Sequence, residues 1–275
     1  MKTRLITAFV GLALMIPLLI FSDTWLFVAA ASCMGFVGMI EMMRCLGVHH
    51  DIAATWPLYG MAVGLPVAAR LMGQINSFGS LTLYVLMAYF FYLMALTVFS
   101  HKGLNFARSA EIFATGTYVS LVFSSIVMLR DAENGQYLYL LVFLAAWITD
   151  SFAYFTGRLF GRHKLIPAVS PKKTVEGAVG GVIFCVIACL GFGLFTAIVW
   201  DAEPNYLFLG LSGVVLSICA QIGDLIASLI KREHGIKDYG KLFPGHGGVM
   251  DRFDSVAAVA VVLLLIGALP GVNLF

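Results

Sequence analysis

The chain has 275 residues, of which 60% are hydrophobic and only 12% are charged, with a formal net charge of +2. Soluble domains carry about 25% charged residues, so this composition excludes an ordinary soluble domain and indicates an integral membrane protein. The five cysteines lie in or beside apolar segments without metal-type spacing, and we interpret them as small core residues. The six histidines lack zinc spacing as well.

Nine segments are almost free of charge, and most reach the roughly 20 residues that a spanning helix requires. We therefore predict an all-α polytopic membrane protein with about nine transmembrane helices. Lys2 and Arg4 before the first segment are also typical of a signal peptide, but no small-residue cleavage site follows before Phe21, which favours an anchored helix. The predicted spans are 5–21, 24–43, 52–72, 80–99, 110–129, 137–156, 177–200, 206–230 and 255–272.

The basic residues are unequally distributed between the two ends of these spans. If the N-terminus and every second loop share one side, that side holds every lysine and arginine except Arg70 and Arg130. The positive-inside rule makes this side cytoplasmic. We thus predict a cytoplasmic N-terminus, an outer C-terminus and a basic inner face suited to anionic lipid head groups or nucleotide phosphates.

The polar residues divide the chain in two. The loops before residue 137 are short, whereas the remainder contains two long loops, 157–176 and 231–254, on the predicted cytoplasmic side. We predict that 1–136 form a scaffold of transmembrane helices that offers dimer contacts. We predict that 137–275 form the catalytic region.

Two carboxylates lie inside apolar segments of the second half. Asp150 and Asp224 each precede the predicted cytoplasmic end of their helix by six residues, or about 9 Å at 1.5 Å per residue. A charge at a helix centre costs ~2.5 to 3.5 kcal/mol, so each acid needs a partner or a function. Because both helices run in the same direction, we predict that the two acids share a polar pocket. A buried hydrogen bond or ion pair is the alternative.

A short motif precedes the seventh predicted span. Ser170 and Pro171 are typical of an N-cap and the first residue of a helix, which places Lys172 and Lys173 in the first helical turn. Cations there oppose the helix dipole, and this favours a bound anion such as phosphate. The positive-inside preference alone is the alternative explanation for the lysines. The same predicted turn contains Thr174 and Glu176.

Three polar residues repeat along one face of the eighth predicted span. Asp224, Ser228 and Lys231 follow one another at i, i+4 and i+7, which places them on one side of a helix. An acid, a hydroxyl and a base on one face suit a metal near the carboxylate and a phosphate near the lysine. For Lys231 and Arg232, anchoring of the helix end at the head groups is the alternative.

The second long loop contains the sequence Gly-His-Gly-Gly at 245–248, whose small side chains let the backbone approach a phosphate closely. Asp251 and Asp254 follow at the start of the ninth predicted span. Paired acids beside glycines and basic residues suit a divalent cation with bound polyphosphate, and their hard oxygen ligands favour magnesium. Capping of that helix by Asp254 is the alternative.

Taken together, these residues resemble the phosphatidate cytidylyltransferase family, also called CDP-diacylglycerol synthases. The family's C-terminal signature, S-x-x-K-R-x4-K-D followed by H-G-G-x-x-D-R-x-D, occurs within 228–254, and 170–177 resembles the family's second motif. The resemblance covers about residues 146–255. The matching residues of the signature and its upstream extension are Gln221, Gly223, Asp224, Ser228, Lys231, Arg232, Lys237, Asp238, Pro244, His246, Gly247, Gly248, Asp251, Arg252 and Asp254.

The resemblance implies that CTP and phosphatidate react to CDP-diacylglycerol and pyrophosphate at the cytoplasmic face of a membrane, usually in a homodimer. We expect a bacterial inner membrane, with membrane lipids as partners and no nucleic acid. The resemblance also implies that Asp224 and Asp251 carry the divalent metal. We hypothesise that Mg²⁺ held there bridges the CTP phosphates, with a second cation left open, and that Asp150 and Asp254 are further candidate ligands.

The predicted site residues fall into a catalytic group and a phosphate-binding group. Catalytic roles are predicted for Asp224, Asp251, Lys231, Arg232, Lys172 and Lys173. Phosphate-binding roles are predicted for Ser170, Thr174, Ser228, Lys237, His246, Gly247, Gly248 and Arg252.

Two other functions fit parts of the sequence. An ion-coupled secondary transporter would also contain intramembrane acids and glycine-broken helices, but it predicts binding groups at the membrane midplane and repeat symmetry. A CTP-dependent polyprenol or lipid kinase would transfer the γ-phosphate and release CDP instead of pyrophosphate. The motif of CDP-alcohol phosphotransferases does not occur in the sequence.

Overall fold

The structure is a computed structural model that describes residues 11, 13, 15–73, 75–99 and 104–275. Within these residues, seven helices are long and apolar enough to cross a membrane. This finding confirms the coarse prediction of an all-α polytopic membrane protein. The number of nine spans and the orientation of the termini stay predictions.

Part of the sequence-based topology falls outside the described residues. The predicted first span, 5–21, is described only in part, and a short helical segment covers its last residues up to Ile20. Lys2, Arg4 and Lys102, which contribute to the predicted charge asymmetry, lie outside the described residues.

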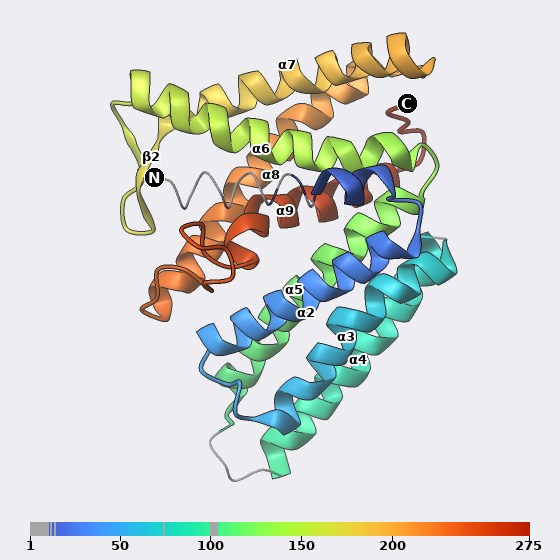
Figure 1. Ribbon diagram of the computed structural model, residues 1–275. Coiled ribbons are helices and arrows are strands. Elements are labelled where there is room, and N and C mark those ends of the chain that lie inside the picture. The colour runs from blue at the N-terminus through green and yellow to red at the C-terminus, as the bar shows by residue number, and fades with distance from the viewer. Residues whose placement is uncertain (1–10, 12, 14, 74, 100–103) are drawn as a thin grey trace. The chain divides into compact units, whose positions relative to one another are not determined.

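The described helices follow the predicted spans, with ends that differ by a few residues. The helix α9, predicted as a ninth span at 255–272, begins earlier and is not among the seven membrane candidates. The helices of Figure 1 are α2 (Trp25–Cys45), α3 (Ile52–Met72), α4 (Ile75–Phe99), α5 (Phe106–Asp131), α6 (Gly135–Phe160), α7 (Val175–Trp200), α8 (Tyr206–Glu233) and α9 (Met250–Gly267).

The chain falls into two compact units. Unit 1 comprises Met1–Ala132 and Ile236–Asp251, and unit 2 comprises Glu133–Gly235 and Arg252–Phe275. The chain therefore passes between the units more than once. The functional division predicted at residues 136 and 137 stays a prediction.

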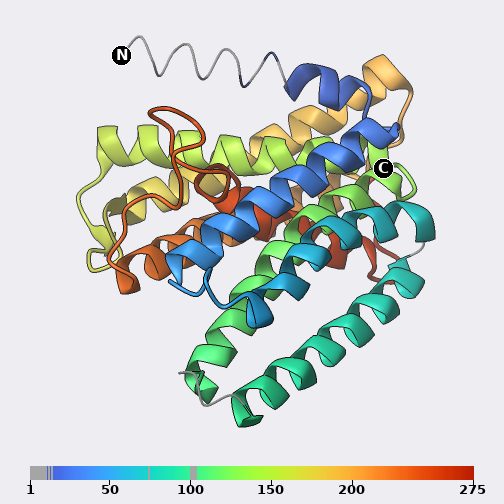
Figure 2. The same cartoon turned by 60° about the horizontal axis from the view of Figure 1, so that its bottom comes forward.

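In unit 1, the helices α2, α3 and α5 pack against one another, and α4 packs on α3 and α5 at the edge of the bundle (Figure 2). Met39, Met42, Leu58 and Phe123 are fully buried in its core. Gly116 of α5 faces Leu58 so closely that a Cβ atom there would overlap the leucine side chain. Small residues at such crossings let membrane helices approach each other, and dispersion contacts then stabilise the bundle.

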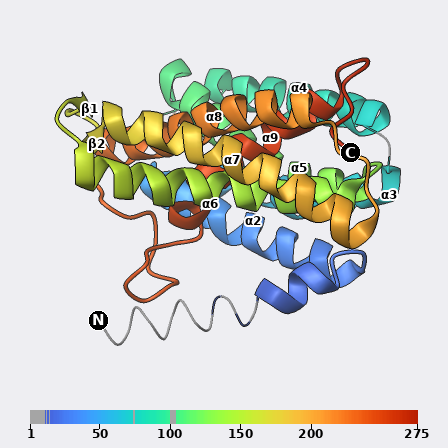
Figure 3. The ribbon, with the colours of Figure 1, turned by 90° about the horizontal axis from the view of Figure 1, so that it is seen from above.

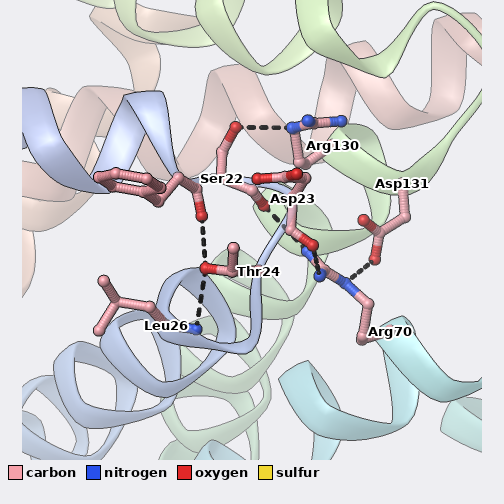
Figure 4. A network of polar contacts seen from close by, with 8 residues as sticks. Ser22, Asp23, Thr24, Leu26, Arg70, Arg130 and Asp131 are labelled. Atoms are coloured by element: carbon pink, nitrogen blue, oxygen red, sulfur yellow. Dashed lines mark hydrogen bonds and ion pairs between the residues drawn. The ribbon is translucent and has the colours of Figure 1, made fainter.

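A polar network ties together one end of unit 1 (Figure 4). Arg70 at the end of α3 forms an ion pair with Asp131 at the end of α5. Its Nη1 and Nη2 atoms donate to the backbone oxygens of Asp23 and Ser22, at 2.7 and 3.0 Å. Arg130 Nε donates to the Ser22 hydroxyl at 2.7 Å. Both arginines that break the predicted charge asymmetry are thus held by protein acceptors.

In unit 2, α6, α7 and α8 pack against one another, and Figure 3 shows the strands β1 (Lys164–Ile166) and β2 (Ser170–Thr174) at one end of α6 and α7. The strands form an antiparallel hairpin in which Ile166 pairs with Ser170. Glycines of α7 allow its close approach to α6. A Cβ atom at Gly177 would overlap the Ala153 carbonyl, and one at Gly180 would overlap Thr156.

The hairpin corrects one prediction. Ser170 and Pro171 do not begin a helix, and Lys172 and Lys173 lie in β2 instead of a first helical turn. The N-cap of α7 is Thr174, whose side chain accepts a hydrogen bond from Gly177 N at 3.1 Å. The prediction was wrong because serine and threonine are both favoured N-cap residues, and pairing with β1 extends the first of them into a strand.

Candidate active site

Unit 2 contains a cavity of about 270 Å³ whose wall combines acids, bases and apolar groups. It lies between the hairpin and the helices α6, α7 and α8. The two intramembrane acids predicted to share a polar pocket, Asp150 and Asp224, both line it. Both helices continue further past these acids than the six residues predicted, because α6 ends at Phe160 and α8 at Glu233. The other lining residues are Ala153, Tyr154, Gly157, Arg158, Leu165, Lys172, Lys173, Thr174, Gly177, Ala178 and Gln221.

An ion pair joins the hairpin to α8 in the wall of this cavity. Lys173 Nζ lies 2.6 Å from Asp224 Oδ2, and it also donates to the backbone oxygen of Gln221 at 3.3 Å. The two charged side chains are about one quarter exposed, at 22% and 27%. The pair is therefore partly shielded from solvent, and each charge offsets the cost of burying the other.

Gln221 in turn fixes this part of α8. Its Nε2 atom donates to the Ala178 oxygen of α7 at 3.2 Å. One turn of α8 earlier, Ser217 accepts a hydrogen bond from Thr149 of α6 at 3.0 Å. These two contacts cross-link α8 to α7 and α6 beside the acids.

Further acids of unit 2 gather around Asp224. Asp150 Oδ2 accepts a hydrogen bond from the Ser255 hydroxyl at 2.7 Å, and it lies within electrostatic range of Asp224, Lys173 and Arg252. Asp254 is within range of Asp224, Asp150 and Lys231. Asp254 is not an N-cap, because α9 begins before it at Met250. Three carboxylates thus act on one another, and basic side chains offset part of their charge.

The hairpin is held in place by Glu176 in the first turn of α7. Its carboxylate accepts hydrogen bonds from the backbone amides of Arg162 and His163, at 3.1 and 3.2 Å, and it contacts His163 Nδ1 at 2.6 Å. Together with the Thr174 cap, these bonds fix both ends of the hairpin against the start of α7. The hairpin consequently presents Lys172 and Lys173 from a defined backbone.

Several predicted residues of unit 2 lie outside the cavity lining. Ser170 pairs within the hairpin, and Ser228 lies one turn beyond Asp224 on α8. Lys231 is buried, with 8% exposure, whereas Arg232 and Arg252 are exposed. Arg158 and Tyr154 are cavity residues that the sequence analysis did not single out. Arg158 donates to the Tyr154 hydroxyl at 3.3 Å.

In unit 1, the segment 236–251 contains the remaining predicted residues: Lys237, His246, Gly247, Gly248 and Asp251. Its backbone amides point toward protein acceptors. His246 N donates to Phe243 O at 2.8 Å, and Gly248 N donates to Asp251 Oδ2 at 2.9 Å. Asp251 Oδ2 also accepts from Tyr239 N at 2.7 Å. Gly247 has φ of +88°, a conformation that favours glycine, and it lies against the Asp251 side chain.

Sequence reasoning missed one buried acid of unit 1, Glu41 in α2. It is 5% exposed and accepts hydrogen bonds from Val249 N and Met250 N, at 3.1 and 3.0 Å. The sequence does contain a pattern that could have revealed it, because Glu41 is an acid in an apolar segment, as Asp150 and Asp224 are.

The acidic groups of both units supply only oxygen donors. Among the residues that the structure describes, no group of three or more His, Cys, Asp and Glu side chains is arranged to hold a metal ion. Mg²⁺ is nevertheless commonly bound by one or two carboxylates, with substrate phosphates and water as the other ligands. The donor chemistry therefore fits magnesium without a preformed cage.

Comparison with known proteins shows the family to which the chain belongs. A sequence model of the cytidylyltransferase family matches residues 2–269. The chain belongs to the cytidylyltransferase family. The match covers nearly the full length, so it includes helices of both units.

Individual cytidylyltransferases match the chain over the same length. A phosphatidate cytidylyltransferase of Staphylococcus haemolyticus is 34% identical over 263 residues, which cover 96% of this chain and 97% of the relative. One of Staphylococcus saprophyticus is 35% identical over 271 residues, with the same coverage. One of Staphylococcus aureus is 33% identical over 264 residues, again with 96% and 97% coverage. The similarity extends well beyond the 146–255 region of the sequence resemblance.

Proposed function

We propose that this protein is a phosphatidate cytidylyltransferase, which makes CDP-diacylglycerol and pyrophosphate from CTP and phosphatidate. The observation that carries the proposal is the near full-length similarity to cytidylyltransferases of that name. The cavity of unit 2 supports it, since two lysines and two acids line one space among apolar helices. Such a site suits the binding of an anionic lipid beside a nucleotide.

The reaction needs no nucleophilic side chain. A phosphate oxygen of phosphatidate attacks the α-phosphorus of CTP, and the bond to the β-phosphate oxygen breaks as the new P–O bond forms. Pyrophosphate leaves with the electrons of that bond. The main task of the protein is electrostatic, because two anions must approach each other and negative charge builds on the leaving group.

The basic residues meet this task. Lys172 and Lys173 line the cavity, and the hairpin backbone that carries them is held against α7 by Glu176 and Thr174. We assign them to substrate phosphates. The further phosphate-binding groups of the proposal are Lys231, Arg232, Lys237, Arg252, Ser170, Ser228 and the loop of His246, Gly247 and Gly248.

The acids are proposed to hold Mg²⁺, with Asp224 and Asp251 as its ligands and Asp150 and Asp254 as further candidates. A bound magnesium ion would neutralise phosphate charge and polarise the α-phosphorus. Asp251 is suited to this assignment because two backbone amides fix its Oδ2 atom. Lys173 is suited to orient the Asp224 side chain, since its Nζ atom lies 2.6 Å from Asp224 Oδ2. A second cation remains part of the proposal.

We further propose that the protein lies in a bacterial plasma membrane with the site at the cytoplasmic face and that it acts as a homodimer. The apolar helices and the bacterial relatives support a membrane location. The predicted charge asymmetry supports the orientation. Access from the cytoplasm is required because CTP is a cytosolic, highly charged substrate.

The decisive experiment incubates the purified protein in detergent with CTP, Mg²⁺ and phosphatidate. We expect pyrophosphate and a CDP-lipid in equal amounts, and neither product when phosphatidate or CTP is left out. Release of CDP with a phosphorylated lipid would instead establish the kinase alternative. Absence of any product with active lipid and metal would overturn the proposed function. Chelation of divalent cations by EDTA tests the metal, since we expect it to stop turnover and added Mg²⁺ to restore it.

A further inference from the structure

Glu41 is a buried acid that the proposed reaction does not use. It lies in α2, surrounded in sequence by apolar residues, and is 5% exposed. An ionisable group inside an apolar helix is costly unless it is paired, so it marks a function or a specific contact. Its partners therefore indicate what it does.

These partners are two consecutive backbone amides at the start of α9, that of Val249 just before the helix and that of Met250, its first residue. Val249 N donates to Glu41 Oε1 and Met250 N donates to Glu41 Oε2, at 3.1 and 3.0 Å. Both donor residues are fully buried. The first amides of a helix have no partner within the helix, and a carboxylate there satisfies them and interacts favourably with the helix dipole. Glu41 thus caps α9 from more than two hundred residues away in sequence.

The segment before α9 is shaped to fit this carboxylate. A Cβ atom at Gly240 or at Gly248 would overlap the Glu41 carboxyl group. The backbone can pass there only because these residues lack side chains. Glu41 and the segment 236–251 consequently fit each other closely.

The same segment fixes Asp251. Gly248, which packs against Glu41, donates its amide to Asp251 Oδ2 at 2.9 Å. Met250, which donates to Glu41, is the neighbour of Asp251 in the first turn of α9. The same short backbone segment therefore contacts Glu41 and holds the Asp251 side chain.

We propose that Glu41 is a positioning residue for the reaction: it anchors the 236–251 segment and so sets the position of the Asp251 carboxylate. This inference rests on the proposed function, in which Asp251 binds the divalent cation. It extends the site to α2, a helix of the N-terminal half that the sequence analysis assigned only to a scaffold.

The test is Glu41→Gln in the full-length protein in detergent, read out by Mn²⁺ binding with electron paramagnetic resonance. Gln keeps the shape, but its NH₂ group meets one of the two amide donors, so one hydrogen bond is lost. We expect the Kd of Mn²⁺ to rise about tenfold, the lower end of the range for groups that hold a metal ligand in place without binding the metal. The Mg²⁺ concentration for half-maximal turnover should rise in parallel, and excess Mg²⁺ should restore part of the turnover.

Asp51→Asn is the matched control. Asp51 also holds a helix start in unit 1, since its Oδ1 atom accepts from Ala54 N of α3 at 3.3 Å. The same chemical change there should affect thermal stability slightly and leave the Kd of Mn²⁺ unchanged. Glu41→Asp is the second variant, because it keeps the charge but is one methylene too short to reach both amides. Its Kd should lie between those of the wild type and Glu41→Gln.

Unchanged Mn²⁺ binding in folded Glu41→Gln or Glu41→Asp would overturn the proposal. Failure of both variants to fold would also overturn it, since Glu41 would then support the whole unit instead of Asp251. Wild-type protein that binds Mn²⁺ but forms no CDP-diacylglycerol would contradict the proposed function alone, and the comparison of Kd values would still test Glu41.

Discussion

The hairpin before α7 and the segment before α9 both contain basic residues and glycine or proline, yet they use their backbones differently. In the hairpin, Glu176 binds backbone amides just before β1, Thr174 at the end of β2 caps α7, and Lys172 and Lys173 line a cavity. In the 236–251 segment, backbone amides bind two acids, Glu41 and Asp251. The first element therefore presents cations, and the second presents a carboxylate that amides hold in place.

This difference separates two tasks in the proposed chemistry. Phosphates need positive charge that can adapt to them, which flexible lysine side chains provide. A metal ligand needs a fixed position, which backbone hydrogen bonds to one of its oxygens provide. Variants of the hairpin should consequently alter the affinity for substrate. Variants of the 236–251 segment should alter the dependence of turnover on the metal.

The largest effect is expected for Asp251→Asn. The variant loses the charge that would bind Mg²⁺, so pyrophosphate release should fall by more than about 100-fold, since even partners behind a metal ligand are typically worth 10 to 100-fold. The rate at saturating CTP and phosphatidate measures this loss, and gel filtration in detergent verifies folding. Asp201→Asn is a suitable control, because Asp201 is exposed and has φ of +49°, which asparagine also tolerates. Near-normal turnover of Asp251→Asn would contradict the role of the 236–251 segment as the carrier of a metal ligand.

A smaller effect is expected for Lys173→Gln. Removal of this ammonium group leaves Asp224 without its ion-pair partner and removes one cation from the cavity. We expect kcat/KM for CTP to fall about tenfold to a hundredfold, at or below the lower end of the range for a buried charge pair, because this pair is about one quarter exposed. Lys164→Gln in β1 is the control, since Lys164 is exposed in the same hairpin and lies outside the cavity lining. Equal losses in both variants would show that the hairpin acts only through its overall charge.

The smallest effect is expected for Glu176→Gln, which touches the hairpin backbone but not its lysines. The neutral amide keeps one acceptor oxygen and loses the charge, so the amides of Arg162 and His163 should exchange hydrogen faster with solvent. We expect the KM for CTP to rise about threefold with little change in kcat, as for a loss of charge-assisted hydrogen bonds in an exposed setting. Hydrogen exchange measured by mass spectrometry and steady-state kinetics provide the two readouts. Unchanged exchange at these amides would contradict the anchoring of the hairpin by Glu176.

The sequence predicted the helices well because their signal is local. Apolar runs of about 20 residues have few stable alternatives to helix in a membrane, and α3 at Ile52–Met72 matches its predicted span 52–72. The hairpin was missed because its signal is not local. Strand formation at Ser170–Thr174 depends on a partner strand, whereas the serine and proline there are equally typical of a helix start.

The acids illustrate the same limit within the site. Asp150 and Asp224 were found because a charge in an apolar run is visible in the sequence, and their common cavity followed from helix direction. Glu41 gives the same local signal, but its partners Val249 and Met250 are backbone amides, which every residue has. A sequence contains no pattern that pairs a carboxylate with a distant amide. Only the folded chain reveals that contact.

The ion pair of Arg70 and Asp131 also has a consequence for biosynthesis. Its two members are 61 residues apart, and the arginine comes first. At roughly 5 to 20 residues per second, the ribosome needs on the order of several seconds to reach the aspartate. During that period Asp131 does not yet exist, whereas the backbone oxygens of Ser22 and Asp23 are already synthesised. The network of Figure 4 thus contains both an early partner and a late partner for the same guanidinium group.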